Sequence, residues 1–299
     1  MGTGIVKTTE NFGSQAEWPS HPELLDWLAV EFMEPSSGLL VNDRPIHAWD
    51  MKGLLKQMVM SRAYQQSASR RGLETLVERD PDNRWLGRGP RFRLPGEILR
   101  DQALHVSGLL STKLGGPSAR PYMPEGVWDE TSVYGDLRNY KHDPGEGLYR
   151  RSLYTVWKRT AAPPSMLIFD APSREICTVS RSRTNTPLQA LSLMNEVTFV
   201  EAARKLGERM MKHSATTPEG KLTYGFRLAT GRKPSEQELR VLVSGWREDI
   251  AYYEQHADEA TQLLRHGDSP SEVPSPAELV AYMLSGNVLL NLDESIMRE

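Results

Sequence analysis

The sequence has a single cysteine, Cys177, which excludes an intrachain disulfide framework and any cysteine-based zinc or haem-attachment motif. Its seven histidines lack the His-x-His and His-Glu-x-x-His spacings of local metal sites. Neither a Gly-x-Ser-x-Gly nucleophile motif nor a phosphate-binding glycine loop occurs. No apolar run could span a bilayer, and no signal segment opens the chain. Taken alone, these absences predict a cytoplasmic chain with no membrane span and no metal or cofactor of its own.

Positive charge is also in short supply, because 36 Lys and Arg face 39 Asp and Glu and give a formal net charge of −3. A general nucleic-acid binder carries a basic face over much of its surface, so no nucleic-acid partner is expected. The hydrophobic fraction of 38% and the charged fraction of 25% are ordinary for a soluble globular protein. With 299 residues, the chain is long enough to bury a core.

Apolar periodicity predicts a mainly α fold, a single helical domain over 1–299 with a few short strands around residues 149–180. Helices are expected at about 20–34, 50–67, 95–111, 187–211 with a break near Asn195, 218–229, 235–253 and 277–289. The clearest start is Thr186-Pro187-Leu188-Gln189, because Thr suits the N-cap, Pro the first turn and Gln the third position of a capping box. Cys177 is expected to be a small buried side chain rather than a nucleophile.

The segment from Arg150 to Arg183 is the basic part of the chain, with seven cations against two acids and a net charge of +5. Two interpretations are open: an anion-binding cleft, or an internal ion-pair network, which is favoured because buried charges are normally paired within a fold. The candidate cluster consists of Arg150, Arg151, Arg159, Asp170, Arg181, Arg183 and Asp101. Leu153, Trp157 and Phe169 are expected to be buried among them, and Arg150 or Arg151 to pair with Asp101 or Asp170.

Residues 115–149 form a long acidic loop with several aromatic residues, directly before the basic segment. We expect loop and segment to fold together and to neutralise each other. The enzyme hypothesis uses this loop: Trp128 would stack on a sugar ring while Asp129, Glu130 or Asp170 supplied the paired carboxylates of glycoside hydrolysis. The substrate would then be an anionic or sulfated polysaccharide. The favoured alternative is a binding or assembly module without catalytic activity.

Several segments resemble one family closely. They are Pro19-Ser20-His21-Pro22-Glu23-Leu24-Leu25-Asp26-Trp27-Leu28-Ala29, Ile98-Leu99-Arg100-Asp101, Gly115-Gly116-Pro117-Ser118, Arg150-Arg151-Ser152-Leu153-Tyr154, Phe169-Asp170-Ala171-Pro172 and Thr186-Pro187-Leu188-Gln189. The chain resembles the planctomycete-type domain of unknown function 1553 over nearly its whole length. No activity is established for that family, so the resemblance assigns no catalytic residue.

The resemblance implies a larger envelope protein in which cytochrome-c-like and planctomycete-specific domains lie upstream. These upstream domains are the expected partners, and the chain would then be exported. The haem-binding Cys-x-x-Cys-His of the cytochrome-c-like domain does not occur here. The opening segment, residues 1–19, holds apolar residues without a pattern that would bury them locally, so we expect it to dock on the helical body and present an apolar face to an upstream domain.

Overall fold

The computed structural model describes residues 2–11, 13–70, 72–128, 140–158, 161–271 and 275–298. Among these residues it has twelve α-helices and only four strands of two residues each, so the predicted mainly α fold is confirmed. The chain forms two compact units: unit 1 is Met1–Phe92 with Arg298–Glu299, and unit 2 is Arg93–Met297. It passes from one unit to the other within β3 (Phe92–Arg93) and β4 (Met297–Arg298). The single-domain expectation stays a prediction, because it depends on how strongly the units are coupled.

Unit 1 is built from short elements. They are α1 (Pro22–Met33), β1 (Leu40–Val41), β2 (Arg44–Pro45), α2 (Met51–Met60) and α3 (Glu74–Arg79). The strands β1 and β2 pair antiparallel through a two-residue turn, in which Asn42 and Asp43 both have positive φ. Such turns match the twist of a hairpin and favour Asn and Asp at these positions.

Helix α1 begins at Pro22, slightly later than the predicted start at about residue 20. Its N-cap is His21, without a side-chain cap bond, while the Ser20 hydroxyl donates to the carbonyl of Ile5 at 3.2 Å. Ser20 is therefore not the N-cap of this helix. Helix α2 is also shorter than the predicted 50–67 and ends at Met60, although Asp50 does cap it by accepting from the Lys52 N–H.

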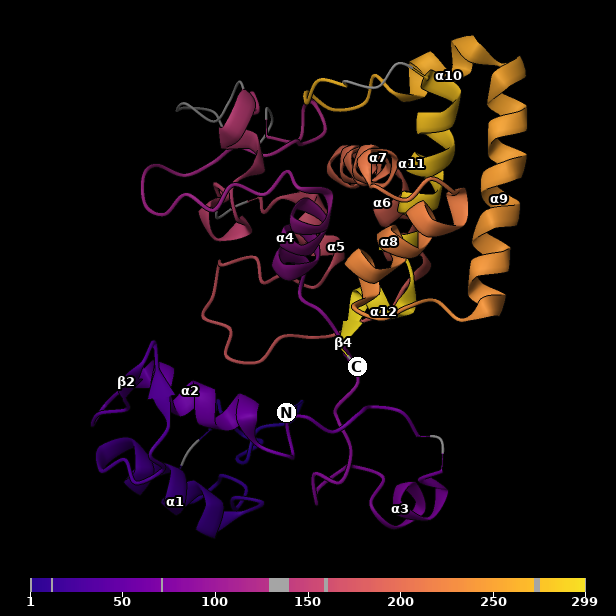
Figure 1. The fold of residues 1–299 in the computed structure, drawn as a ribbon. Coiled ribbons are helices and arrows are strands. Elements are labelled where there is room, and N and C mark those ends of the chain that lie inside the picture. Colours follow the sequence, from indigo (N-terminus) through magenta and orange to yellow (C-terminus); the bar gives the residue numbers. More distant parts are fainter. Residues whose placement is uncertain are drawn as a thin grey trace. The chain divides into compact units, whose positions relative to one another are not determined.

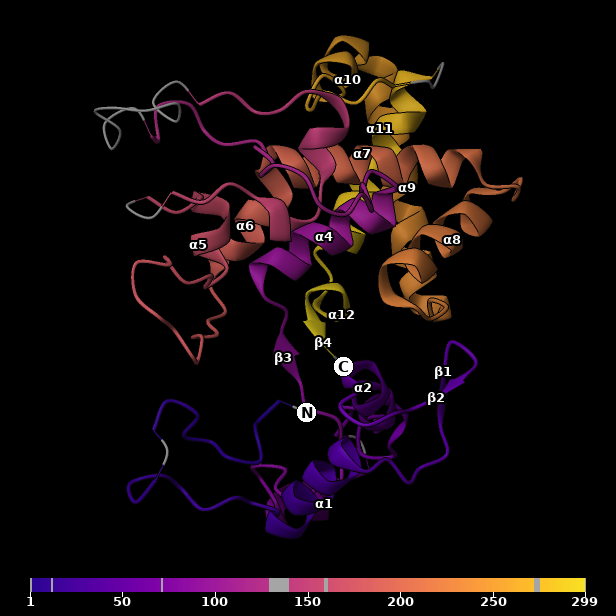
Figure 2. The same cartoon turned by 90° about the vertical axis from the view of Figure 1, so that its left-hand side faces the viewer.

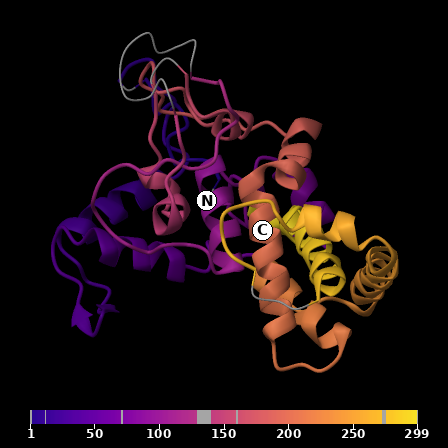
Figure 3. The same cartoon turned by 90° about the horizontal axis from the view of Figure 1, so that it is seen from above.

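Unit 2 has a helical core around α7, which lies between α4 and α11 while α9 runs along the outside (Figures 1 and 2). Its elements are α4 (Gly96–Ser107), the 3₁₀ helices η1 (Gly145–Tyr149) and η2 (Ser152–Tyr154), α5 (Pro164–Ile168), α6 (Pro187–Asn195), α7 (Val197–Lys212), α8 (Pro218–Thr230), α9 (Glu236–Gln255), α10 (Ala257–Leu263), α11 (Pro276–Leu290) and α12 (Asp293–Ile296). From above, the yellow α11 lies beside the orange α7 (Figure 3). The core fills the space between these helices with side chains such as Leu206, Met210, Phe226 and Leu289.

Helices α7 and α11 approach each other closely at two glycines. A Cβ on Gly207 would lie 2.9 Å from the backbone nitrogen of Met283, and a Cβ on Gly286 would lie 2.9 Å from the carbonyl oxygen of Ala203. Real Cβ atoms essentially never come this close, so any larger residue at either position would push the helices apart. The two glycines therefore set the distance between the central helices.

The helix ends of unit 2 follow the sequence signals. Thr186 is the N-cap of α6 in a capping box with Gln189, whose side-chain oxygen accepts from the Thr186 N–H at 3.0 Å. Glu196 ends α6 and caps α7, which confirms the predicted break. Ser235 and Glu238 form the capping box of α9, and Gly231 ends α8 in the left-handed conformation. These local signals were sufficient because each one satisfies a free backbone group at a helix terminus.

In the described part of residues 149–180, the predicted short strands are not formed. The described part of this stretch contains η2, α5 and single bridges, such as Ala119 with Thr155, instead of paired strands. Phe169 is buried as predicted, with 3% of its surface exposed. Leu153, in contrast, is 69% exposed, Trp157 is half-buried, and Cys177 is exposed rather than buried. The apolar residues here lie on 3₁₀ turns and loops, where no period places them on an inward face.

Candidate functional site

Two buried arginines hold the centre of the basic segment. Arg100 comes from α4, where its guanidinium donates to the carbonyls of Leu148 and Arg150, both at 2.8 Å. Arg150 donates to the carbonyls of Pro117, at 2.6 Å, and Gly115, and its guanidinium lies 3.8 Å from the centre of the Tyr154 ring. Both side chains are thus used to tie loop backbone to the helical body. The expected carboxylate partner of Arg150 is replaced by carbonyl oxygens.

Asp101 connects α4 to the basic segment. Its carboxylate accepts from the backbone N–H of Ser152 at 2.6 Å and lies 3.8 Å from Arg151 Nε and 3.9 Å from Arg100 Nη1. The predicted pair between Arg151 and Asp101 is therefore present. However, the Arg151 side chain is 46% exposed, so this contact is loose and open to solvent.

Asp170 anchors the other end of the segment. Its backbone has φ of +60°, and its carboxylate accepts from Arg93 and from the backbone N–H and hydroxyl of Thr184 at 2.8 and 2.9 Å. Burial alone would raise the pKa of Asp170, but the hydrogen bonds from Thr184 and the charge of Arg93 outweigh it and lower the pKa. Asp170 is an ionised structural anchor. Its arginine partner is Arg93 and not Arg150 or Arg151, the two partners that the sequence analysis considered.

Of the remaining arginines of the candidate cluster, the structure describes Arg181 and Arg183. Arg181 forms a two-pronged pair with Glu97 of α4, at 2.9 and 3.0 Å, and is 40% exposed. Arg183 is exposed in the stretch between α5 and α6. Arg159 lies outside the described residues. Glu97 and Asp101 lie one turn apart on α4, and each meets an arginine of the basic segment.

The loop before the basic segment folds against it as expected. The Ala119 N–H donates to the carbonyl of Tyr154 at 2.6 Å, and the Val156 N–H donates to the carbonyl of Ala119 at 2.8 Å. One of the loop acids, Asp143, accepts from the backbone N–H of Arg120 within the loop. Among the described residues, backbone hydrogen bonds and the Arg150 side chain join the two stretches.

Trp128 is a core side chain of the loop. It is 1% exposed, its indole N–H donates to the carbonyl of Ala161 at 2.7 Å, and its ring meets Tyr140 edge to face. Its ring faces are covered by protein, so they offer no platform for a sugar. Asp129 and Glu130, the expected carboxylate partners, lie outside the described residues.

A buried polar network on α7 was not anticipated. Glu201 is fully buried and accepts from the Tyr149 hydroxyl at 2.8 Å and the Ser269 N–H at 2.7 Å, while Arg204 donates to the Ser269 carbonyl at 2.6 Å. Burial, together with the hydrogen bond to Glu201, raises the pKa of Tyr149 to about 12 and keeps it a neutral donor. No sequence signal marked this burial, because Glu201, Arg204 and Glu208 recur at helical spacing on the face of α7 opposite Leu206 and Met210, a pattern typical of a solvated face.

The network fixes the connection between α10 and α11. Gly267 has φ of +86°, and a Cβ there would lie 2.2 Å from Glu201 Cδ, so only glycine leaves room for the carboxylate. The Asp268 N–H donates to the Tyr122 hydroxyl, and its carboxylate lies 2.9 Å from His142. These contacts hold the backbone of Asp268 and Ser269 in place. The carboxylate of Glu201 has no access to solvent.

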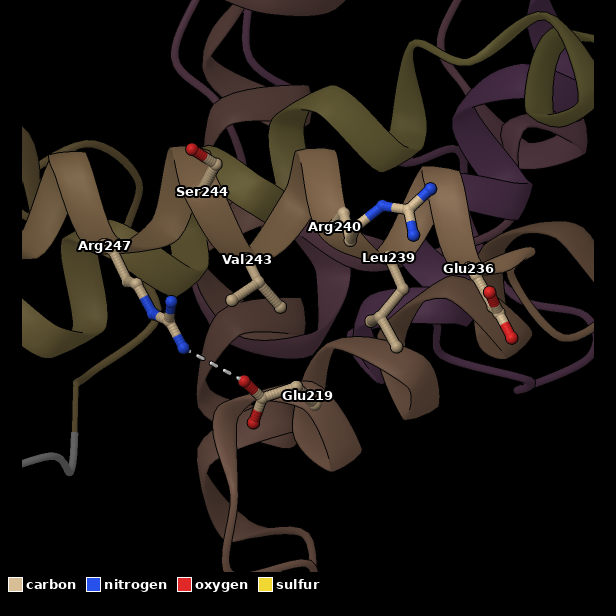
Figure 4. Close-up of a pocket in the computed structure, with 7 residues that line it drawn as sticks. All are labelled: Glu219, Glu236, Leu239, Arg240, Val243, Ser244 and Arg247. Atoms are coloured by element: carbon tan, nitrogen blue, oxygen red, sulfur yellow. Dashed lines mark hydrogen bonds and ion pairs between the residues drawn. The ribbon is translucent and has the colours of Figure 1, made fainter.

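A groove lies between α8 and α9 (Figure 4). It has a volume of about 590 Å³ and is lined by Glu219, Glu236, Leu239, Arg240, Val243, Ser244 and Arg247. Leu239 and Val243 point from α9 toward α8, and Arg247 reaches Glu219 at 3.3 Å (Figure 4). Both members of this pair are largely exposed, so the groove is an open surface feature. It holds no residue of the predicted cluster.

Two further features, a metal-ligand cluster and a membrane-spanning helix, are absent among the described residues. No group of three or more His, Cys, Asp or Glu side chains there is arranged to hold a metal ion. Likewise, none of the helices in that part of the chain is long and apolar enough to cross a membrane.

The comparisons with known proteins identify a family. No match was found among curated proteins or among solved structures. A family profile described as "Protein of unknown function (DUF1553)" matches residues 1–245, which is most of the chain. The chain therefore belongs to the DUF1553 family.

Proposed function

We propose that the chain is a non-catalytic binding or assembly module of a larger envelope multidomain protein, and that unit 1 contains its binding surface. The observation that carries this proposal is how little apolar surface unit 1 buries. Ala68 is the only apolar side chain of its described residues that is buried. The helices α1 and α2 each bury a single residue, Glu31 and Gly53.

The large apolar side chains of these helices lie exposed instead. We call them, with the neighbouring Trp49, the α1–α2 apolar surface: Trp27, Val30, Met33, Trp49, Met51, Leu55, Val59 and Met60, which are 42–66% exposed. So many exposed apolar side chains on two short helices favour an interaction site, and Trp and Met are enriched at protein interfaces. Full burial of such a side chain contributes about 1.5–3 kcal/mol, and these side chains, which are about half exposed, forgo roughly half of it until a partner covers them.

Three charged residues at the centre of unit 2 support the same proposal, because they are occupied within the fold. Arg100 and Arg150 hold loop carbonyls, and Asp170 is held by Arg93 and Thr184. A catalytic acid–base pair needs groups that face a substrate. The geometry favours a scaffold, and no described residue gives the hydrolase hypothesis a specific argument.

The partners we propose are the cytochrome-c-like and planctomycete-specific domains that the family resemblance places upstream. The purified chain should bind an apolar dye or self-associate, and an upstream domain added in trans should suppress both. Dye fluorescence and light scattering with and without that domain provide the test. Turnover of a sulfated polysaccharide by the purified chain would refute the non-catalytic part of the proposal.

A further inference from the structure

A stripe of four exposed side chains runs along α1. Glu23, Trp27 and Val30 follow each other at steps of four and three residues, which places them on one face of the helix, and Glu34 follows four residues later as the C-cap of α1. Trp27 is 50% exposed and Val30 is 54% exposed, and the two glutamates are exposed as well. The stripe thus has an apolar centre and an acid at each end.

A different face of α1 is fixed to the rest of unit 1. Leu24, Leu28 and Phe32 are half-buried there, and the Phe32 ring meets Trp49 edge to face at 5.2 Å. These contacts set which side of the helix turns outward.

Glu31 locks this orientation through its buried carboxylate. It accepts from the N–H and hydroxyl of Ser36, from the N–H of Ser37 and from the Gln57 amide of α2 at 2.6 Å. The hydroxyl of Ser36 contributes most to lowering the pKa of Glu31, to about 2, so the group is ionised at neutral pH. The stripe is therefore presented by a helix whose rotation is determined, and binding does not have to order it.

We propose that this stripe docks a helical protein surface with an apolar centre and a basic residue at each end. The inference rests on the proposed function and specifies the partner of the same surface. Glu23 and Glu34 are eleven residues apart, or roughly 16 Å along a helix at 1.5 Å per residue. Two basic residues at a similar spacing would meet them while apolar side chains cover Trp27 and Val30. A buried aromatic anchor inside a polar rim is the usual anatomy of a binding hot spot.

The charge of α1 favours a protein over a membrane. The segment from Pro22 to Glu34 holds four acids, Glu23, Asp26, Glu31 and Glu34, and no lysine or arginine. Helices that lie on anionic membranes carry lysine and arginine on their polar face. A phosphate backbone would be repelled by the same acids.

The test uses the full chain and two synthetic amphipathic helical peptides. Both have the same apolar stripe; one has a lysine at each end of it and the other has a glutamate at each end. Calorimetric titration should show that the chain binds the lysine peptide about tenfold more tightly, because two exposed charge pairs change from attraction to repulsion. The double variant Glu23→Lys with Glu34→Lys should reverse this preference.

Control variants distinguish the effect of the stripe from an effect of net charge. Different outcomes also distinguish a failure of this inference from a failure of the proposed function. Glu78→Lys with Asp82→Lys makes the same change of charge on exposed residues elsewhere in unit 1 and should leave the preference unchanged. Trp27→Ala with Val30→Ala should weaken binding of both peptides. The inference would be overturned if the control variant lost the preference for the lysine peptide equally, or if the Glu23→Lys with Glu34→Lys variant kept it. Either result would still leave the apolar surface as a binding site. No binding of either peptide by a dye-silent monomer would overturn the proposed function itself, and so would binding only to phosphatidylglycerol vesicles.

Discussion

Arg150 and Arg151 are neighbours in the sequence with opposite structural roles, and this contrast gives a sharp stability prediction. Arg150 is 7% exposed and donates at close range to the carbonyls of Pro117 and Gly115. Hydrogen bonds from a charged donor are worth about 1.5–3 kcal/mol each. Water will reach part of the freed loop backbone, so Arg150→Ala should destabilise the protein by about 3 kcal/mol. This corresponds to a fall in melting temperature of about 6–12 °C.

Arg151→Ala is the matched comparison. Its guanidinium lies 3.8 Å from Asp101 and is 46% exposed, and exposed ion pairs contribute about 0–1 kcal/mol. The larger loss of stability is therefore expected at Arg150. Calorimetric melting of both variants provides the assay, with Arg150→Lys as a third variant that keeps the charge but loses the planar fork. Equal effects of the two alanine variants would refute the role assigned to the buried guanidinium.

Three further predictions test other parts of the account. Because the folded pKa of Asp170 lies below its unfolded value, its contribution to stability is present above about pH 4 and is lost as the pH falls through the folded pKa, so urea unfolding of wild type and Asp170→Asn should converge in acid. A constant difference at all pH values would contradict this. Cys177 is exposed, so an aromatic disulfide reagent should modify it in the native state as fast as in urea, and strong protection would show that it is covered. Phe169→Ala should cost about 3–5 kcal/mol and Leu153→Ala less than about 1 kcal/mol, since the first side chain is buried and the second exposed; similar denaturation midpoints would contradict the assigned burial.

Helices with complete terminal signals could be predicted from the sequence. The Thr186 and Ser235 capping boxes and the left-handed Gly231 each satisfy backbone groups within a few residues, so their outcome does not depend on the rest of the fold. The polar stripe of α4 was also predictable, because helical spacing placed Glu97 and Asp101 on one face, where arginines of the basic segment meet them.

The sequence-based predictions that failed concern features that depend on contacts between distant parts of the chain. The pairing of Arg150 with carbonyl oxygens depends on where loop 115–149 runs, and no pattern within the segment indicates that. Burial at Leu153 and Cys177 was predicted from apolar character alone, which says little in irregular backbone. The exposed face of α1 was missed for the opposite reason, because apolar residues occur on both of its sides and periodicity could not tell the packed side from the free one.

The central claim is that the α1–α2 apolar surface is free to bind, and apolar-dye titration of the full chain measures this directly. Trp27→Lys with Val30→Lys should clearly reduce dye fluorescence. Val241→Lys, at an equally exposed apolar position on α9, should not. A signal that the α1 variant leaves unchanged, or that the Val241 variant reduces as strongly, would contradict the claim.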